Sequence, residues 1–146
     1  MYANMKISEG LGLLATIDPV SQAAGTITTG WVDQSTYLTM LAVIHTGVMG
    51  ASATVDAKLQ QATDSGGTGA KDVSGKAITQ FVKASGDNKQ AMINLKEADL
   101  DTEGGFRFVR LSITVGTAAS LISAALFGGT PRFMPATNQA ATVQVV

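Results

Sequence analysis

The sequence predicts an all-β fold, a single-domain antiparallel β-sandwich or barrel of about seven or eight short strands. Three observations support this prediction. Apolar and polar residues alternate along several segments, as they do in strands with one buried face. Clusters of Gly, Asp, Asn and Ser interrupt these segments at intervals of about 8–15 residues. No segment of ten or more residues repeats apolar residues with the 3.6-residue period of an amphipathic helix.

The clearest strands lie at residues 55–60 and 111–115. In both segments every second residue is apolar, and the residues between them are polar. We therefore expect one side of each strand to face the core. The predicted core side chains are Val55, Leu59, Leu111, Ile113 and Val115.

Further strands are predicted along the rest of the chain. They are residues 11–17, 26–32, 37–46, 77–82, 90–95 and 121–127. Turns are predicted between them, among others at Asp18-Pro19 and at Gly128-Gly129. The Gly-rich segment 64–76 is expected to be a flexible loop between two strands.

Two predicted strands have apolar residues at both odd and even positions, that is, on both faces of the strand. In residues 37–46 this pattern is typical of a central strand, or of a strand between its own core and a neighbouring subunit. In residues 106–115 the apolar parity changes after Phe108. Either a β-bulge redirects this strand, or both of its faces are covered where it starts.

The chain divides into residues 11–130, the β-sandwich domain, and two extended arms. The N-terminal arm is 1–10 and the C-terminal arm is 131–146; Pro131 and Pro135 keep the latter from forming a helix. Residues 142–146 alternate and could add an edge strand. At most one short helical turn is expected, at residues 94–100.

Composition excludes several classes of protein. The 146 residues include 10 basic and 11 acidic side chains, so no basic surface for nucleic acid is expected. The longest apolar run, Leu38–Gly50, is shorter than the roughly 18 residues of a membrane span. Charged residues make up only 14%, against about 25% in an average domain. This low charge favours a soluble subunit whose surface is covered by neighbours in an assembly.

The motifs that carry chemistry are incomplete. Gly75-Lys76 resembles the end of a phosphate-binding loop, but Ala70 and Ala77 stand where that loop needs Gly and Ser or Thr. His45, in an apolar strand, is interpreted as buried or at an interface, since there is no Gly-x-Ser-x-Gly elbow. Alternating acidic residues at 99, 101 and 103 could hold calcium but are interpreted as a solvated turn. No catalytic residue, metal or cofactor is predicted.

Apolar residues on the arms and isolated aromatic residues are the candidates for a subunit interface. Trp31 fits either the core, the favoured interpretation, or an interface anchor. Because apolar side chains on irregular termini are costly in water, at least one arm is expected to order against another subunit. The predicted interface residues are Tyr2, Met5, Trp31, Tyr37, Phe133, Met134 and Val145.

Several stretches resemble a family of small tailed-bacteriophage virion proteins encoded among the head genes. They include DAKLQQATD at 56–64 and GFRFVRLSITVGTAA at 105–119, with shorter pieces at 67–73, 75–80 and 93–95. The resemblance covers roughly residues 30 to 135. It implies a capsid decoration (cement) protein on the exterior of the virion. Its partners would be the major capsid protein and sister copies in a homotrimer, without nucleic acid, membrane or enzymatic activity.

Two other classes of function remain open at this stage. A tail-tube, tail-terminator or head–tail joining subunit would form a ring, and the loop at 64–76 could dock the next ring. A host-receptor or glycan-binding module would need exposed aromatic residues, and the chain has only eight aromatics, made up of one Trp, two Tyr and five Phe.

Overall fold

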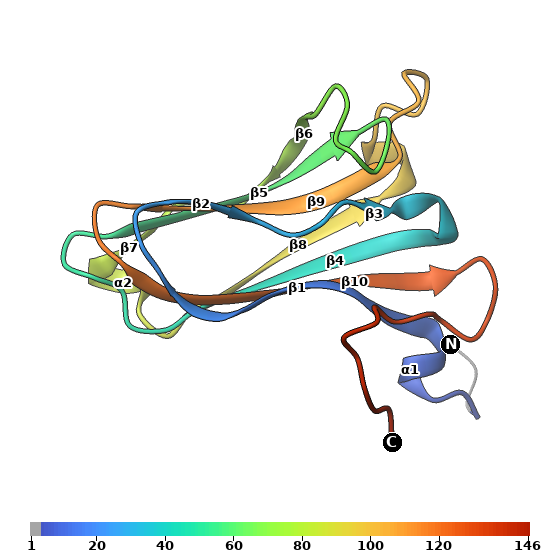
Figure 1. Cartoon of the computed structure of the whole chain (residues 1–146), viewed down its shortest axis with the longest axis horizontal. Helices are drawn as coiled ribbons and strands as arrows, with labels where there is room; N and C mark the ends of the chain where they lie inside the picture. The colour runs from blue at the N-terminus through green and yellow to red at the C-terminus, as the bar shows by residue number, and fades with distance from the viewer. Residues whose placement is uncertain (1–3) are drawn as a thin grey trace.

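The fold is an antiparallel β-sandwich, as predicted. The computed structural model describes residues 4–146, of which 52% lie in strands and 10% in helices. Figure 1 shows two layers of strands, with the helical turn near the N-terminus and the C-terminal segment on the outer side of one layer. There are ten strands in the described residues, more than expected, because two of them contain only two residues.

The first layer, sheet A, has four strands. Their spatial order is β1 (Leu11–Gln22), β10 (Ser120–Pro131), β4 (Tyr37–Thr46) and β8 (Gln90–Lys96). β4 is therefore central, which confirms one interpretation of its apolar residues on both parities. β1 and β8 are the edge strands of this sheet.

The second layer, sheet B, has six strands. Its main order is β2 (Gly25–Thr28), β9 (Phe108–Gly116), β5 (Thr54–Ala62) and β6 (Lys71–Ala77). Two short strands extend it: β3 (Val32–Asp33) pairs with β9, and β7 (Phe81–Val82) pairs with β5. The helices are single turns, namely α1 (Ile7–Gly10), η1 (Gln34–Thr36), α2 (Lys83–Gly86) and η2 (Glu97–Asp99). The last of these lies within the predicted helical turn at residues 94–100, although residues 94–96 belong to β8. The described residues contain four helical turns, whereas at most one was expected.

The core lies between the two sheets. All five predicted core side chains are buried, none more than 1% exposed. They come from β5 and β9 of sheet B and meet Met40, Ala42 and Ile44 of β4 from sheet A. Alternation within each strand places one apolar row in this space, which is why the period-2 pattern located the core.

Residues 71–77 form strand β6 instead of the predicted flexible loop. The turn before it is ordered by Asp64, whose carboxylate accepts hydrogen bonds from the amides of Gly66 and Thr68. β6 then pairs with β5, and two of its lysines bind the segment that connects β8 to β9. Lys71 binds Asp101 and Lys76 binds Asp99, at 2.5 and 3.0 Å. These pairings are long-range, so local composition did not indicate them.

Two predicted turns lie inside strands instead. Asp18-Pro19 is part of β1, where the pairing with β10 shifts register between Ile17 and Val20. Gly128-Gly129 is part of β10 and pairs with both β1 and β4. Pro19 is tolerated because the register shift breaks the pairing there. The predicted strand 77–82 shortens to β7, since β6 ends at residue 77.

The change of parity in β9 is caused by coverage of both faces, not by a bulge. The pairing of β9 with β5 is continuous from Phe108 to Gly116. At the start of the strand, Arg107 lies over the ring of Phe108, 5.2 Å from its centroid. Lys71 covers the ring of Phe106 in the same way, at 4.1 Å.

The terminal arms differ in part from the extended form expected of them. In the N-terminal arm, residues 7–10 form the helical turn α1. In the C-terminal arm, residues 136–139 run along the free edge of β1: the amide of Ala136 donates to the carbonyl of Glu9, and that of Gln139 to Leu13. This segment covers the β1 edge, which would otherwise be open to pairing with other chains. Residues 142–146 form no strand.

Candidate assembly surfaces

The outer face of sheet A carries no acidic residue, Lys or Arg in its central rows. The register aligns these rows across the four strands, so that Thr16, Ala125, Val43 and Met92 form the middle one. We call this surface the apolar face. It consists of Leu13, Thr16, Leu41, Val43, His45, Gln90, Met92, Asn94, Leu121, Ser123, Ala125 and Phe127. Met92 is 65% exposed and Leu121 is 47% exposed.

The outer face of sheet B is polar and makes its hydrogen bonds within the chain. Asp72 of β6 accepts from Lys58 at 2.8 Å and from Gln60 at 2.9 Å. Arg110 donates to the side-chain oxygen of Gln60 at 2.9 Å. The hydrogen bond from Lys58 lowers the pKa of Asp72 most, followed by that from Gln60. This face is therefore suited to contact with water.

The two outer faces thus differ in kind. Exposed apolar side chains that gather on one sheet face mark an interaction surface more often than scattered ones do. A face without charged groups also loses little hydration energy when a partner covers it. The apolar face is the best candidate for an assembly surface in the described residues 4–146.

The apolar face is bounded at one end by the termini. Side chains of α1 and the last two residues, Val145 and Val146, flank it next to Leu13 and Phe127, enclosing a groove of about 640 Å³. We call α1 and residues 145–146 the terminal ridge. Figure 1 shows α1 and the C-terminus projecting from sheet A on the side away from sheet B.

At the opposite end the same face is hollowed. A depression of about 450 Å³ lies between β1, β10 and the end of β4. We call it the distal hollow; its lining includes Pro19, Val20, His45 and Leu121. The apolar face therefore has a ridge at one end and a hollow at the other.

Several predicted interface residues lie beside the terminal ridge. Met5 is half-buried and, with Met134 and Ile7, lines a mostly apolar groove of about 390 Å³. Phe133 is 86% exposed, and Val145 is 57% exposed. Tyr2 lies outside the described residues. The contact of these side chains with another subunit stays a prediction.

Tyr37, another predicted interface residue, is instead buried in its own chain. Its ring lies against Gly12 and Gly128, where a Cβ atom would collide with it. Its hydroxyl donates to the carbonyl of Thr137 at 2.8 Å and accepts from the amide of the same residue at 3.1 Å. The residue therefore holds the C-terminal segment against β1, a role that depends on contacts 100 residues apart in sequence.

Trp31 is not in the core, contrary to the favoured interpretation. It is half-buried and packs against Gly67 of the β5–β6 turn, while the guanidinium of Arg110 lies 4.5 Å from its ring centroid. Both neighbours belong to its own chain. Short strands β2 and β3 leave the residue between them outside the inter-sheet space, which the sequence pattern alone did not show.

His45 is exposed, so the buried alternative for it is wrong. It lies on the apolar face in β4, opposite Ser123 and Gln90 of the adjacent strands. Met92 and Leu121 share this face but were not identified as candidates. A signal was present for Met92, because it has the opposite parity to the core residues Ile93 and Leu95.

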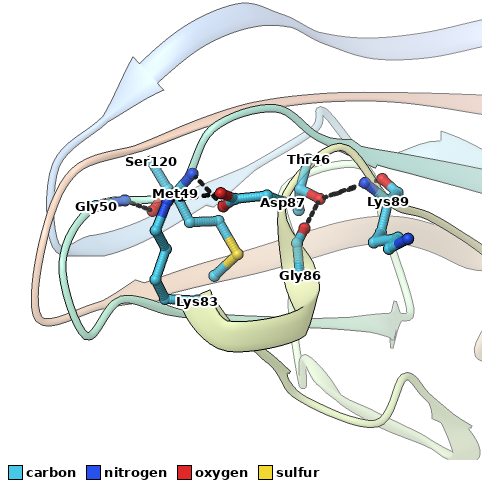
Figure 2. A network of polar contacts seen from close by, with 8 residues as sticks. All are labelled: Thr46, Met49, Gly50, Lys83, Gly86, Asp87, Lys89 and Ser120. Atoms are coloured by element: carbon cyan, nitrogen blue, oxygen red, sulfur yellow. Dashed lines mark hydrogen bonds and ion pairs between the residues drawn. The ribbon is translucent and has the colours of Figure 1, made fainter.

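A polar network closes the end of the sandwich near α2. Figure 2 shows Asp87 between the amide of Met49, which donates to it at 2.9 Å, and the ammonium of Lys83 at 2.6 Å. These bonds lower the pKa of Asp87, that from Lys83 most. The hydroxyl of Thr46 donates to the carbonyl of Gly86 and accepts from the amide of Lys89 at 3.1 Å. Each partner is satisfied within the chain, so the network fastens loops and offers no reactive group.

The acidic residues 99 and 101 are each paired with a lysine and do not converge on one point. Within the described part of the chain, no group of three or more His, Asp or Glu side chains is placed to hold a metal ion. None of the helices described is long and apolar enough to cross a membrane.

Comparisons with known proteins give structural likenesses only. No family model matches the chain, and no curated protein matches its sequence. The prophage-derived protein YomS of SPBc2 is 8% identical, with a TM-score of 0.44, over 86% of this chain and 100% of that one. A subunit of Bacillus endospore appendages, described as disulfide-linked pili, is 14% identical, with a TM-score of 0.34, over 88% and 98%.

A carbohydrate-binding module, CBM4, is 12% identical with a TM-score of 0.40. The match covers 67% of this chain, which spans 56% of the length of that protein. These neighbours thus include a prophage-derived protein and a subunit of a surface appendage. No function is taken from them.

Proposed function

We propose that this protein is a structural subunit of a bacteriophage virion, a decoration (cement) protein that binds the major capsid shell and stabilises it. The observation that carries the proposal is the gathering of exposed apolar side chains on one side of the molecule, over the apolar face and the terminal segments. A subunit that is complete in its own core but apolar outside it is suited to permanent contact with neighbours.

The rest of the molecule supports an assembly role. Two antiparallel sheets packed over one core make the sandwich stiff, so it can hold contacts in fixed positions. Phe133, Val143 and Val146 lie on terminal segments and are 86%, 94% and 100% exposed. Such segments can cover a wide partner surface when they order on it. They are the proposed contacts with the shell.

A glycan-binding role is less well supported. Sugar recognition commonly uses an exposed aromatic ring as a platform. The rings of Trp31, Phe106 and Phe108 each carry a cationic side chain of the same chain over one face. These rings are therefore not free on both faces to stack on a ligand.

The test is the position of the chain in purified particles. Antibody against this chain, conjugated to gold, is expected to label the shell over its whole surface. Mass spectrometry is expected to find many copies per particle. Particles that lack the chain are expected to rupture at lower temperature, because a bound subunit stabilises the assembled shell by mass action.

Other labelling patterns contradict the proposal. Label confined to the tail or to the head–tail junction would favour the ring-forming alternative. If purified wild-type particles contained no copy of this chain, the virion role would be contradicted. Shells equally stable with and without the chain would contradict the cement function, even if the chain decorates them.

A further inference from the structure

We propose that the apolar face packs on the same face of a second copy of this chain, across a two-fold axis that runs along the row Thr16, Ala125, Val43 and Met92. This pairing goes beyond the proposed function, since it concerns the free protein and holds whether or not the chain binds a shell. The argument rests on size, sheet twist, side-chain complementarity and the position of charge.

The size of the face is close to what a specific pair needs. Four strands at about 4.8 Å spacing and seven residues at about 3.4 Å give a face of roughly 450 Å². Two such faces bury about 900 Å², near the lower limit of about 1,000 Å² for a specific interface. The terminal ridge of each copy adds further contact at both ends.

Sheet twist favours an identical partner. Face-to-face sheets pack at a small angle when their twists match, with side chains of the two faces interdigitating. A second copy has the same twist by identity. An axis lying in the interface and perpendicular to the strands places each strand antiparallel over its own copy, as closed two-fold contacts require.

The side chains of β10 are complementary under this operation, because large residues of one copy lie over small residues of the other. The two-fold rotation about the row at Ala125 places Phe127 of one copy over Ser123 of the other, and Leu121 over Gly129. In both pairs a large side chain meets a small residue. In β4 the same reversal places Leu41 over His45 and leaves Val43 over itself. This correspondence follows from the register that aligns Ala125 with Val43.

The two ends of the face are complementary as well. The reversal carries the terminal ridge of one copy towards the distal hollow of the other, on the side of β1 and β10 in both cases. Apolar groups on the ridge are Ile7, 66% exposed, and Val145, 57% exposed. The hollow offers Pro19, Val20 and Leu121 to them.

Within the strands, charge lies only at the margin of this pairing, whereas the terminal ridge includes Glu9 and has Lys6 beside it. Lys96 at the end of β8 and Asp18 in β1 border the face. The operation sends the two Lys96 side chains to opposite ends of β8, so that like charges do not meet. A second copy presents the same uncharged central rows, so no charged side chain of these rows lies against them.

The first experiment measures the mass of the full chain in solution. Sedimentation equilibrium of the purified protein is expected to give a dimer. Val43→Lys is expected to weaken dimerisation at least about tenfold, because two lysines then face each other in a desolvated contact. Thr114→Lys, on the exposed polar face of sheet B, is the matched control and is expected to leave the dimer intact. Circular dichroism establishes that each variant is folded.

A second experiment tests the axis itself. Val43→Lys and Val43→Glu are each expected to be monomeric alone and to form a heterodimer when mixed, because position 43 faces its own copy. The chain has no Cys, so Ala125→Cys introduces a unique thiol. A short bismaleimide is expected to join two copies of this variant at least about tenfold faster than copies of Thr114→Cys, as sheets about 10 Å apart allow.

Each contrary result overturns the proposal. A monomeric wild type means that the apolar face does not bind a second copy, and loss of shell binding by Val43→Lys would then assign the face to the shell. A trimer, or a dimer that Val43→Lys leaves unchanged, places the contact elsewhere. Failure of the mixed variants to pair, with a dimeric wild type, removes the two-fold axis.

Discussion

At the scale of single residues, burial decides which apolar side chains matter for stability. Leu111 and Leu59 are completely buried between the sheets, whereas Leu121 is 47% exposed on the apolar face. All three are leucines in strands. Their environments differ only because β5 and β9 turn one parity inwards and β10 places Leu121 outwards.

Leu111→Ala is expected to lower the free energy of unfolding by about 2–5 kcal/mol, because the cavity it leaves lies in a packed core. Leu121→Ala, the control on the apolar face, is expected to cost much less in the monomer. Urea unfolding followed by fluorescence of the single Trp measures both. A similar loss for the two variants would contradict the assignment of the inner face.

Variants at Gly67 and Gly75 distinguish the cost of backbone strain from the cost of a steric collision. Both have positive φ, +85° and +73°, but a Cβ at Gly67 would lie 2.6 Å from the indole nitrogen of Trp31, whereas nothing lies within 4 Å at Gly75. Gly75→Ala is therefore expected to cost about 1–2 kcal/mol from the left-handed conformation alone. Gly67→Ala is expected to cost more and to shift the Trp fluorescence. Equal costs would show that Trp31 does not pack there.

At the scale of elements, the C-terminal segment completes the edge of sheet A. Residues 136–139 bind β1 through main-chain and side-chain hydrogen bonds, and Asn138 accepts from the amide of Leu13 at 2.7 Å. The segment beyond residue 139 contributes exposed valines instead. The arm predicted from sequence therefore has two parts, one that belongs to the fold and one that is free for a partner.

Deletion of residues 140–146 is expected to leave the domain folded with its β1 edge protected. Deletion of 136–146 is expected to speed hydrogen exchange at the amide of Leu13 and to promote aggregation, because an edge strand is uncovered. Tyr37→Phe is expected to cost about 1 kcal/mol through loss of its hydroxyl contacts with Thr137. If the Leu13 amide exchanges at the same rate in both deletion variants, residues 136–139 do not cover the edge of β1.

At the scale of the whole molecule, acidic side chains fasten the loops at both ends. The side-chain hydrogen bond from Thr68 lowers the pKa of Asp64 most. Hydrogen bonds from lysines or backbone amides lower the pKa of Asp72, Asp87, Asp99 and Asp101 most. For Asp99 the amide of Lys96 contributes most, followed by the ammonium of Lys76. These groups are solvated, so each contributes little alone. Asp72 lies in β6, and the other four lie in the turns and short helical segments between strands.

A lowered pKa in the folded state means that the unfolded state binds protons more readily. The stabilisation is therefore present above the unfolded value of about 3.9 and is lost as the pH falls below it through the folded values. Stability measured in urea is expected to be constant from about pH 7 to 5 and to fall below about pH 4. Asp99→Asn is expected to reduce the loss of stability at low pH. The control Asp18→Asn is expected to leave this loss unchanged. A pH-independent stability would contradict these pairings.

The sequence by itself determined the fold class, the inner parity of the main strands and the core, because alternation with period 2 depends only on which side of a strand is buried. It also indicated that β4 is apolar on both faces. It did not reveal β6, because this strand is held by its pairing with β5 and by ion pairs of its two lysines with aspartates distant in sequence. Nor did it show that Tyr37 holds the C-terminal segment or that Trp31 lies outside the core.

The apolar face was likewise decided by tertiary structure alone. Its residues come from β1, β4, β8 and β10, and each strand contributes only two to four of them. No local pattern distinguishes an outward apolar residue that will meet similar neighbours from one that will stand alone. Only the order of the strands and their register bring these side chains into one surface, since both depend on contacts between segments far apart in the chain.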